Sequence, residues 1–500
     1  MSQNTIDSTN PKYDDQIDRW ILYQDGYYGE GGFQDGTYIE KFPRETTENY
    51  GDRKKSRFFL NYCAPVIDIL NGHLFKQRAV RENNNKNVDT FLKGVDRHKT
   101  MTMNAFMKEV SLTGQIYGIC FIVIDAPIVN NEEILTEADA SQLNLVHYAY
   151  ILSPQALTNW MLDERGKFLW AVIKEEYIDE SQKVDPFGDH EIKTRYRLWE
   201  RDKWSVWEED KSKKNKTEWI MTDSGVNPLG EVPIIVHYNK KKEDMIGISE
   251  INTIVDINKD IYNCTSEIRH LHRSSLFPIL TYCGNASDLA TNPTTNNDGL
   301  ITSTTPKIKT IDMGADTLLS YEIGATPPAF ISPPATSFQE YRDWIKDEIE
   351  VIYQMAKLNY TGGVAESGVA LAWKFDKTNQ TLADRATSLQ QTENEIVKLF
   401  CKWSNITDNS YNVQYPMEFG LQDLLHDLEI AMKIISLRLS TTFDKLYKQK
   451  LVKTIMPEIN LKDINVINKE IEGEVEPQKN LAAEPQGDEN VRPNETEPRK

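Results

Sequence analysis

Four acidic residues in the second half of the chain are spaced so that they would form one negatively charged face of a helix. After Pro334 they repeat at i, i+3, i+7 and i+10, which is one face of a helix: Glu340, Asp343, Asp347 and Glu350. Apolar residues of the same segment share another face: Tyr341, Ile345, Ile349 and Ile352. Like charges at such spacings destabilise an isolated helix by only about 0.2–0.5 kcal/mol per pair. Two interpretations stay open, a solvated helix face and the wall of a channel that must not bind phosphate.

A glycine-rich segment after that helix is the second candidate for a functional site. It contains three glycines and has no strong structural preference: Tyr360, Thr361, Gly362, Gly363, Val364, Ala365, Glu366, Ser367 and Gly368. One interpretation is a plain connection between two helices, which the residues alone favour. The other is a mobile loop that reaches into a lumen.

Catalytic and metal-binding motifs are not found in the sequence. It has no GxxxxGK[ST] phosphate loop and no GxSxG, HExxH or EF-hand pattern. His270 and His272 lie two apart on an expected helix, so they face different directions and make a poor metal pair. The five cysteines are widely spaced and form no CxxC pair. We therefore expect no catalytic residues, no metal and no cofactor, although a site assembled from distant residues stays an alternative.

Length and charge narrow the class of protein. Five hundred residues predict two to four structural units. A net charge of -19 disfavours a protein that grips DNA in a basic groove, because such affinity comes from neutralising phosphates. Acidity is compatible with DNA that only passes by, since a negative wall repels phosphate. No apolar run approaches about 18 residues, so no membrane span is expected, and the polar N-terminus predicts no signal peptide.

The first half has the pattern of an α+β protein. Residues 1–50 are rich in Tyr, Gly, Asp and Asn and predict a mobile or partner-ordered arm. Helical spacing then predicts a helix of about 22 residues from Lys54, kinked or broken at Pro65, and a second helix over 100–113. Alternating and apolar runs predict strands at 119–124, 146–152, 168–176, 195–199, 204–207 and 233–238, with a hairpin between the fourth and fifth.

The second half is dominated by long helices. Apolar spacing predicts helices over 249–274 with Ser249 as N-cap, 337–358, 368–403 and 421–453. A short strand is expected at 277–282. Beyond Pro457 the chain is acidic and proline-rich without aromatic residues, which predicts a disordered tail over 458–500.

The order of these segments over residues 50–455 resembles the portal proteins of tailed bacteriophages. The segment "SRFFLNYCAPVIDILNGHLFKQ" looks like the opening helix of that family, and "GICFIVIDAP" is similar to the strand that follows its second helix. The segment "LGEVPIIVHYNKKKEDMIGISE" resembles the entry into the first stem helix. The segment "SGVALAWKFDKTNQTLADRATSLQQTENEIVKLF" resembles the long helix after the tunnel loop. No phrase is a strict signature, and the order of the segments carries the resemblance.

The resemblance implies a portal fold with an α+β wing, a helical stem, a small α/β clip and a helical crown. It divides the chain as follows: arm 1–50, wing 51–246 and 369–420, stem helices 247–274 and 336–359, clip 275–335, tunnel loop 360–368, crown 421–457 and tail 458–500. The acidic face then lies on a stem helix, where it would line the channel.

The resemblance also implies function and partners. It implies a ring, usually of twelve copies, that forms a channel at one capsid vertex for DNA packaging and ejection and is not an enzyme. Expected partners are the terminase large subunit, the major capsid protein, a scaffold protein, the head–tail adaptor and double-stranded DNA without sequence specificity. The expected location is the virion, after assembly in the host cytoplasm. The alternatives are another virion protein, such as an adaptor or minor capsid protein, and a nucleic-acid enzyme.

Overall fold

The computed structural model of the chain divides into two compact units, 1–420 and 421–500. It describes residues 5–126, 147–178, 192–209, 218–276, 279–281, 294–295, 301–303, 329–331, 336–358, 368–407, 410–417, 419, 445–446, 448–449, 452 and 461–473. Within these ranges, 273–337, 368–377 and 461–465 are described by their backbone alone. Helices and strands are mixed throughout the first unit, so the predicted α+β class is confirmed.

A three-stranded antiparallel sheet lies at the centre of the first unit. Its middle strand is β2 (Ile119–Asp125), in which every residue is buried. β2 pairs with β3 (Tyr148–Leu152) on one side and β9 (Ile234–Tyr238) on the other. Helices α6 (Met103–Tyr117) and α10 (Gly368–Trp403) pack against this sheet, and α4 (Cys63–Leu74) packs against both helices. The apolar strand predicted at 119–124 is therefore the core of the unit.

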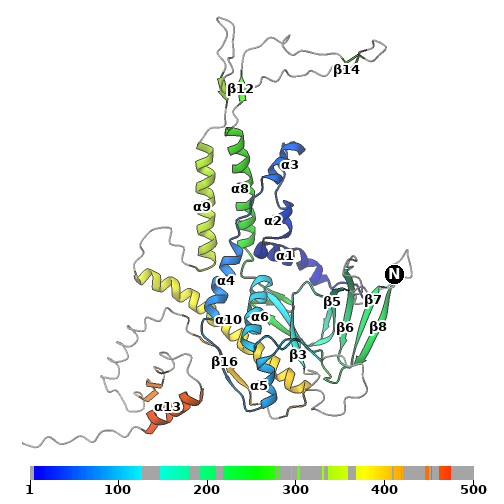
Figure 1. The fold of residues 1–500 in the computed structure, drawn as a ribbon, viewed down its shortest axis with the longest axis vertical. Coiled ribbons are helices and arrows are strands. Elements are labelled where there is room, and N and C mark those ends of the chain that lie inside the picture. The colour runs from blue at the N-terminus through cyan, green and yellow to red at the C-terminus, as the bar shows by residue number, and fades with distance from the viewer. Residues whose placement is uncertain are drawn as a thin grey trace, which may run out of the picture. The chain divides into compact units, whose positions relative to one another are not determined.

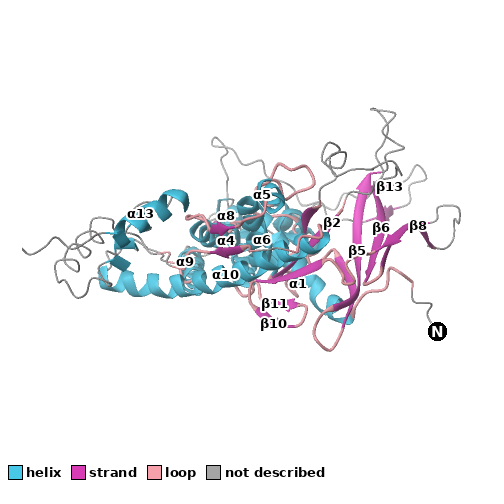
Figure 2. Ribbon diagram, turned by 90° about the horizontal axis from the view of Figure 1, so that it is seen from below, coloured by secondary structure: helices cyan, strands magenta, loops and turns pink. Residues whose placement is uncertain are grey.

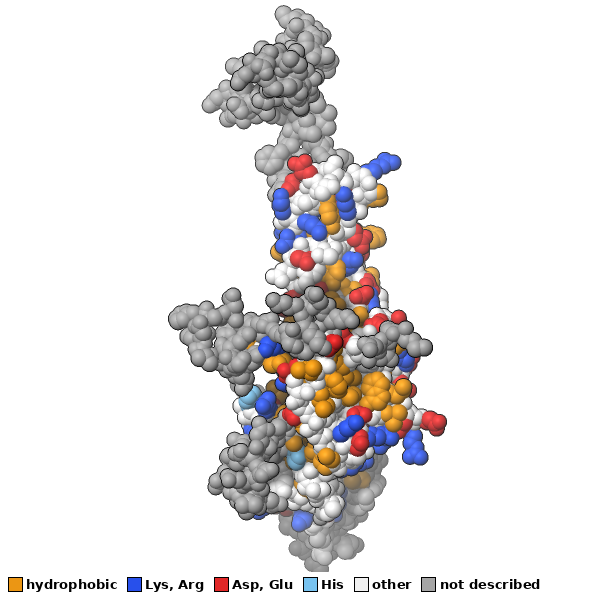
Figure 3. Space-filling view, turned by 90° about the vertical axis from the view of Figure 1, so that its right-hand side faces the viewer, with side chains coloured by type: hydrophobic (Ala, Val, Ile, Leu, Met, Phe, Trp, Pro, Cys, Tyr) orange, Lys and Arg blue, Asp and Glu red, His pale blue; other side chains and the backbone are white. Residues whose placement is uncertain are grey.

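A five-stranded antiparallel sheet forms the second layer (Figure 2). Its strands follow chain order: β4 (Leu157–Leu162), β5 (Phe168–Ile178), β6 (Ile192–Glu200), β7 (Lys203–Glu209) and β8 (Trp219–Val226). The predicted hairpin between β6 and β7 is confirmed. Trp160, Ala171 and Trp199 occupy adjacent registers and are buried, whereas Met161 and Met221 are exposed. On the face seen in Figure 3, hydrophobic side chains gather at about mid-height, and charged side chains of both signs lie above and beside them.

The N-terminal residues are folded, which corrects the expectation of a mobile arm. They form α1 (Pro11–Tyr28), α2 (Gly31–Asp35) and the start of α3 (Thr47–Lys55). The side chain of Asn10 accepts a hydrogen bond from the Lys12 amide and caps α1. Trp20 and Tyr23 lie three residues apart on α1 and are buried in the core. The polar composition concealed this apolar face.

The segment predicted as a kinked or broken helix from Lys54 forms two helices, so the break is confirmed but lies before Pro65 and not at it. α3 ends at Lys55, residues 57–62 are not helical, and α4 begins at Cys63. Pro65 lies in the first turn of α4, where its missing N–H has no helical partner to lose. A helix continuing from Lys54 would place the Pro65 ring against the carbonyl group of Asn61. Proline therefore sets the start of this helix.

The remaining short elements join these layers. β1 (Val80–Glu82) pairs with β16 (Asn412–Gln414), β10 (Lys241–Glu243) pairs with β11 (Ile246–Gly247), and α5 (Lys86–Lys93) packs against α6. Further along the chain, β12 (Ile279–Thr281) pairs with β15 (Ala329–Ile331), and β13 (Thr294–Thr295) pairs with β14 (Ile301–Ser303). The strand predicted at 277–282 thus corresponds to β12.

Two long helices, α8 (Ile254–Leu276) and α9 (Thr336–Met355), run side by side in opposite directions (Figure 1). Their predicted spans, and that of α10, are confirmed within a few residues. Ser249 is not the N-cap of α8, because the helix begins five residues later. Its hydroxyl instead donates to the carbonyl of Ile116 at 2.6 Å and accepts from the amide of Ile251. The serine therefore ties the segment before α8 to the end of α6.

The second unit contains helix α13 (Leu461–Gly473). This helix corrects the expectation that disorder begins at 458. Leu461, Ile464, Ile467 and Ile471 have helical spacing, which is the signal that the acidic composition outweighed. Ile471 is buried, and the Lys445 ammonium donates to the carbonyl of Glu472 at 2.7 Å. Most of the helix predicted over 421–453 lies outside the described residues.

Candidate functional site

The face of α9 that packs on α8 is the apolar face predicted from the sequence. Ile352 is fully buried, and Ile345 and Ile349 pack against the core. The Tyr341 hydroxyl donates to Oε2 of Glu267 on α8 at 2.9 Å, and this hydrogen bond raises the pKa of Tyr341 to about 12. Apolar packing and one hydrogen bond therefore fix the rotation of α9 about its own axis.

The four predicted acidic residues share an exposed face of α9, turned away from α8: Glu340, Asp343, Asp347 and Glu350. They are not equivalent. Asp343 accepts from the Gln339 amide at 3.0 Å and from the Lys346 ammonium at 3.2 Å, and these contacts lower its pKa in that order of importance. Glu350 accepts from the Gln354 amide at 3.1 Å. We call this face the acidic stripe.

An apolar and acidic flank borders the acidic stripe on one side. Trp344, Val351 and Met355 are spaced at i, i+7 and i+11, and their exposed fractions are 56%, 42% and 46%. Beside Trp344, the carboxyl groups of Glu348 on α9 and Asp260 on α8 adjoin each other. Burial, followed by the hydrogen bond to Asp260, raises the pKa of Glu348 to about 8. Sequence reasoning missed this flank, although the spacing of its apolar residues was visible.

The opposite flank of α9 is basic. Arg342 and Lys346 are exposed and lie one turn apart. With 3.6 residues per turn, both lie about 160° around the helix from Trp344. α9 thus presents three different surfaces besides its packing face: the acidic stripe, the Trp344 flank and the basic flank.

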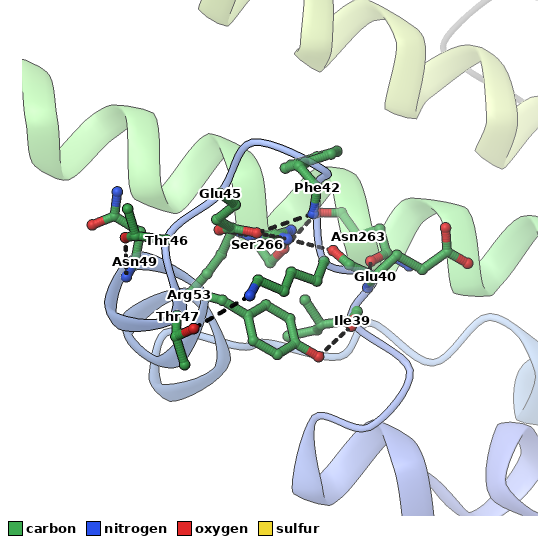
Figure 4. A network of polar contacts seen from close by, with 12 residues as sticks. Ile39, Glu40, Phe42, Glu45, Thr46, Thr47, Asn49, Arg53, Asn263 and Ser266 are labelled. Carbon is green, nitrogen blue, oxygen red and sulfur yellow. Dashed lines mark hydrogen bonds and ion pairs between the residues drawn. The ribbon is translucent and has the colours of Figure 1, made fainter.

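A buried ion pair fastens residues 39–55 to the other side of α8 (Figure 4). Arg53 donates from Nε and Nη2 to the two carboxylate oxygens of Glu45 at 2.9 and 2.8 Å. It also donates to the Ser266 hydroxyl on α8 at 3.3 Å and to the carbonyl of Glu40. Asn263 of α8 accepts from the Glu40 amide at 2.9 Å. α8 is therefore held between α9 and the N-terminal segment.

The base of the helix pair is held by polar contacts from the central sheet and α10. Arg385 on α10 donates to Oε2 of Glu250 at 2.9 Å and to the carbonyl of Asn239. Asn239 donates to the same Glu250 oxygen at 2.9 Å. Gly118 has a positive φ of 85°, and a Cβ on Gly247 would overlap its carbonyl group. These contacts orient the chain as it enters α8.

The second predicted site falls almost wholly outside the described residues. Of 360–368, only Gly368 is described, as the first residue of α10. In the described part of the chain, no group of three or more His, Cys, Asp or Glu side chains could hold a metal ion. Within the same ranges, no helix is long and apolar enough to cross a membrane.

The fold and this surface define an α+β protein whose most distinctive feature is a long helix pair with charged flanks. Residues 7–427 match the model of the family described as "Phage portal protein, SPP1 Gp6-like". The chain therefore belongs to this family of phage portal proteins.

Comparison with individual proteins gives weaker likenesses. No curated protein matches the chain. One similar solved structure is described as the neck of an empty gene transfer agent (GTA) particle, with a TM-score of 0.37, 9% identity and coverage of 80% of this chain and 91% of that chain. Another is described as the virion of a native gene transfer agent particle, with a TM-score of 0.36, 8% identity and coverage of 90% and 98%. Nothing about partners or assembly follows from similarity at this level.

Proposed function

We propose that this portal-family chain forms a ring whose channel, at one capsid vertex, carries DNA during packaging and ejection. The family match over 7–427 carries the proposal and favours it over an adaptor, a minor capsid protein or a nucleic-acid enzyme. The ring is usually of twelve copies in this family. The role is structural, so the energy for packaging comes from a separate motor.

The regions of the portal fold are assigned to the chain on this proposal. α8 and α9 form the stem, residues 275–335 the clip and 360–368 the tunnel loop. Residues 51–246 and 369–420 form the wing, and α1 joins residues 1–50 to it. Residues 421–457 form the crown, and 458–500 follow it. The pairing of β12 with β15 at the end of the helix pair supports a folded clip that begins there.

The acidic stripe suits the wall of a channel for DNA. Its four carboxylates are exposed on the side of α9 opposite α8, so copies arranged in a ring with α8 outward present them to the lumen. Phosphates that pass a wall of the same sign are repelled and do not bind. Because charges interact over about 8–10 Å at physiological salt, such a wall acts on DNA that passes within about this distance of it.

The proposed partners follow from the family role. They are the terminase large subunit docked at the clip, the major capsid protein, a scaffold protein during assembly and the head–tail adaptor afterwards. Double-stranded DNA passes through the channel without sequence-specific contacts. The protein is placed in the virion at the capsid vertex, after assembly in the host cytoplasm.

Electron microscopy of the purified chain tests the ring. In negative stain, rings with a central hole and about twelvefold symmetry are expected. A chain that stays monomeric or dimeric at every protein and salt concentration would contradict the proposal.

Charge reversal tests the channel wall separately from the ring. Asp347→Lys combined with Glu350→Lys is expected to leave ring formation intact and to reduce the amount of packaged DNA several-fold. The reason is that DNA phosphates would then bind to the introduced lysines. The matched control is Glu164→Lys with Asp223→Lys, which changes the net charge equally at exposed positions in the β4–β5 turn and on β8. Normal packaging by the first variant would show that the stripe is only a solvated surface.

A further inference from the structure

The two flanks of α9 carry opposite charges. On one flank, Glu348 and Asp260 adjoin each other beside Trp344, whose indole Nε1 lies 3.5 Å from Oδ2 of Asp260. The ion pairs among the described residues include neither of these carboxyl groups. A partly buried pair of carboxyl groups without a cation is unfavourable, because each destabilises the charged form of the other. The pair is therefore suited to a cation supplied from outside the chain.

The opposite flank supplies cations of suitable reach. Lys346 contacts Asp343 at 3.2 Å, but both side chains are more than half exposed, at 63% and 53%. Surface pairs of this kind are weak, so Lys346 can exchange its partner at small cost. Arg342 lies on the same flank and is exposed. A guanidinium or ammonium group is also attracted to the face of an indole ring such as that of Trp344.

We infer that the Trp344 flank of one copy binds the basic flank of the next copy, with Lys346 or Arg342 reaching the Asp260–Glu348 pair. This inference rests on the proposed ring and names the surfaces that join its members. Because the two flanks lie on opposite sides of α9, the contact is heterologous, and repetition of such a contact closes a ring when the rotation fits.

The apolar residues of the Trp344 flank complete the contact. Val351 and Met355 continue the exposed strip below Trp344 along α9. Burial of this strip against a neighbouring helix removes apolar surface from water, while the charged groups set which flank meets which. The acidic stripe then faces neither α8 nor either neighbour, so it stays free to line the lumen.

A mixing experiment tests the pairing of the flanks. Glu348→Lys and Lys346→Glu each place like charges across the contact, so neither variant alone is expected to form rings at concentrations where the wild-type chain does. An equimolar mixture is expected to assemble, because in alternating order every contact again joins opposite charges. Lys203→Glu, an exposed reversal on β7, is the control and is expected to assemble normally. Native mass spectrometry and electron microscopy read out assembly, and circular dichroism confirms that each variant is folded.

The outcomes separate this inference from the proposed function. Recovery of rings only in the mixture supports the pairing. If the wild-type chain forms rings and each single variant does so equally, or if the folded variants stay unassembled when mixed, the pairing is overturned while the ring stands. If the wild-type chain forms no ring, the proposed function itself fails. Trp344→Ala gives an independent readout and is expected to raise the concentration needed for assembly at least tenfold.

Discussion

Nη2 of Arg53 lies 2.8 Å from Oε2 of Glu45, and their side chains are only 2% and 9% exposed. This pair holds residues 39–55 against α8, because Arg53 also donates to Ser266 of that helix. Removal of one partner from a buried ion pair leaves a charge that neither water nor protein neutralises. Residues 39–55 and α8 therefore depend on each other for their positions.

Glu45→Gln is expected to lower the free energy of unfolding by about 3 kcal/mol, because it leaves the Arg53 guanidinium buried without its counter-charge. Hydrogen exchange is expected to accelerate first in residues 39–55. Urea unfolding and exchange measured by mass spectrometry check both effects. Asp52→Asn serves as control, since it breaks the exposed pair with Lys55 and is expected to cost under about 1 kcal/mol. Equal effects of the two variants would contradict the buried role of Glu45.

The sequence predicted the long helices better than the surfaces that they create. In α9 the apolar residues repeat over several turns, so the span and the packing face were both predictable from Tyr341 to Ile352. The N-terminal helix α1 was missed because the Gly-, Asp- and Asn-rich composition of residues 1–50 outweighed its apolar spacing, although Asn10 and Pro11 are a helix-start signal. β8 was missed because most of its residues are exposed and do not alternate.

The Asp260–Glu348 pair could not be predicted from the sequence. The two residues are 88 positions apart, and their approach depends on how far each helix is rotated about its axis. That rotation is set by contacts such as Tyr341 with Glu267, which are themselves products of the fold. Spacing along one helix identified the acidic stripe, whereas the position of the Asp260–Glu348 pair depends on how the two helices pack.

Gly114 is expected to be indispensable for the packing of α6 on β9. A Cβ at this position would lie 2.8 Å from Cδ2 of His237, so Gly114→Ala must push the helix from the strand. We expect a loss of about 1–3 kcal/mol in the free energy of unfolding. Gly72→Ala in α4 is the matched control. No atom lies within 4 Å of its added Cβ, so it is expected to stabilise the chain by about 0.5–1 kcal/mol. Chemical denaturation measures both, and the same sign for both would refute this account.

Buried His237 makes the stability of the chain sensitive to acid. Burial, with a smaller effect of Arg385, lowers the pKa of His237 to about 3, and Nδ1 lies 2.9 Å from the Thr392 hydroxyl. The unfolded chain binds a proton near pH 6.5 and the folded chain does not. The stability is therefore fully present above about pH 6.5 and falls below it by up to about 1.4 kcal/mol per pH unit.

His237→Asn keeps a polar partner for Thr392 and removes this titration. Between pH 7 and pH 5 the variant is expected to lose about 2 kcal/mol less stability than the wild-type chain, measured by urea unfolding at each pH. His98→Asn changes an exposed histidine and is expected to follow the wild-type dependence. Parallel pH curves for all three proteins would show that His237 is not the group responsible.

Glu348 makes ring assembly depend on pH. Its pKa is raised in the folded chain, whereas that of His237 is lowered. Asp260 and Cys264 of α8 and Trp344 of α9 lie beside its carboxyl group, and burial raises the pKa of Cys264 to about 12. With a pKa of about 8, Glu348 is largely protonated in the free subunit at neutral pH. A lysine docked from the next copy favours the carboxylate, so assembly releases a proton whenever the free subunit holds one.

The affinity of assembly is therefore expected to increase as the pH rises from about 6.5 to 8 and to stay constant above pH 8. The change is expected to reach about tenfold in the concentration at half assembly for each pH unit, the limit for release of one proton. Light scattering over a dilution series at fixed ionic strength measures it. Glu348→Gln cannot release a proton and is expected to assemble with the same affinity across this range. A wild-type ring whose stability does not change between pH 6.5 and 8 would mean that no cation reaches the Asp260–Glu348 pair.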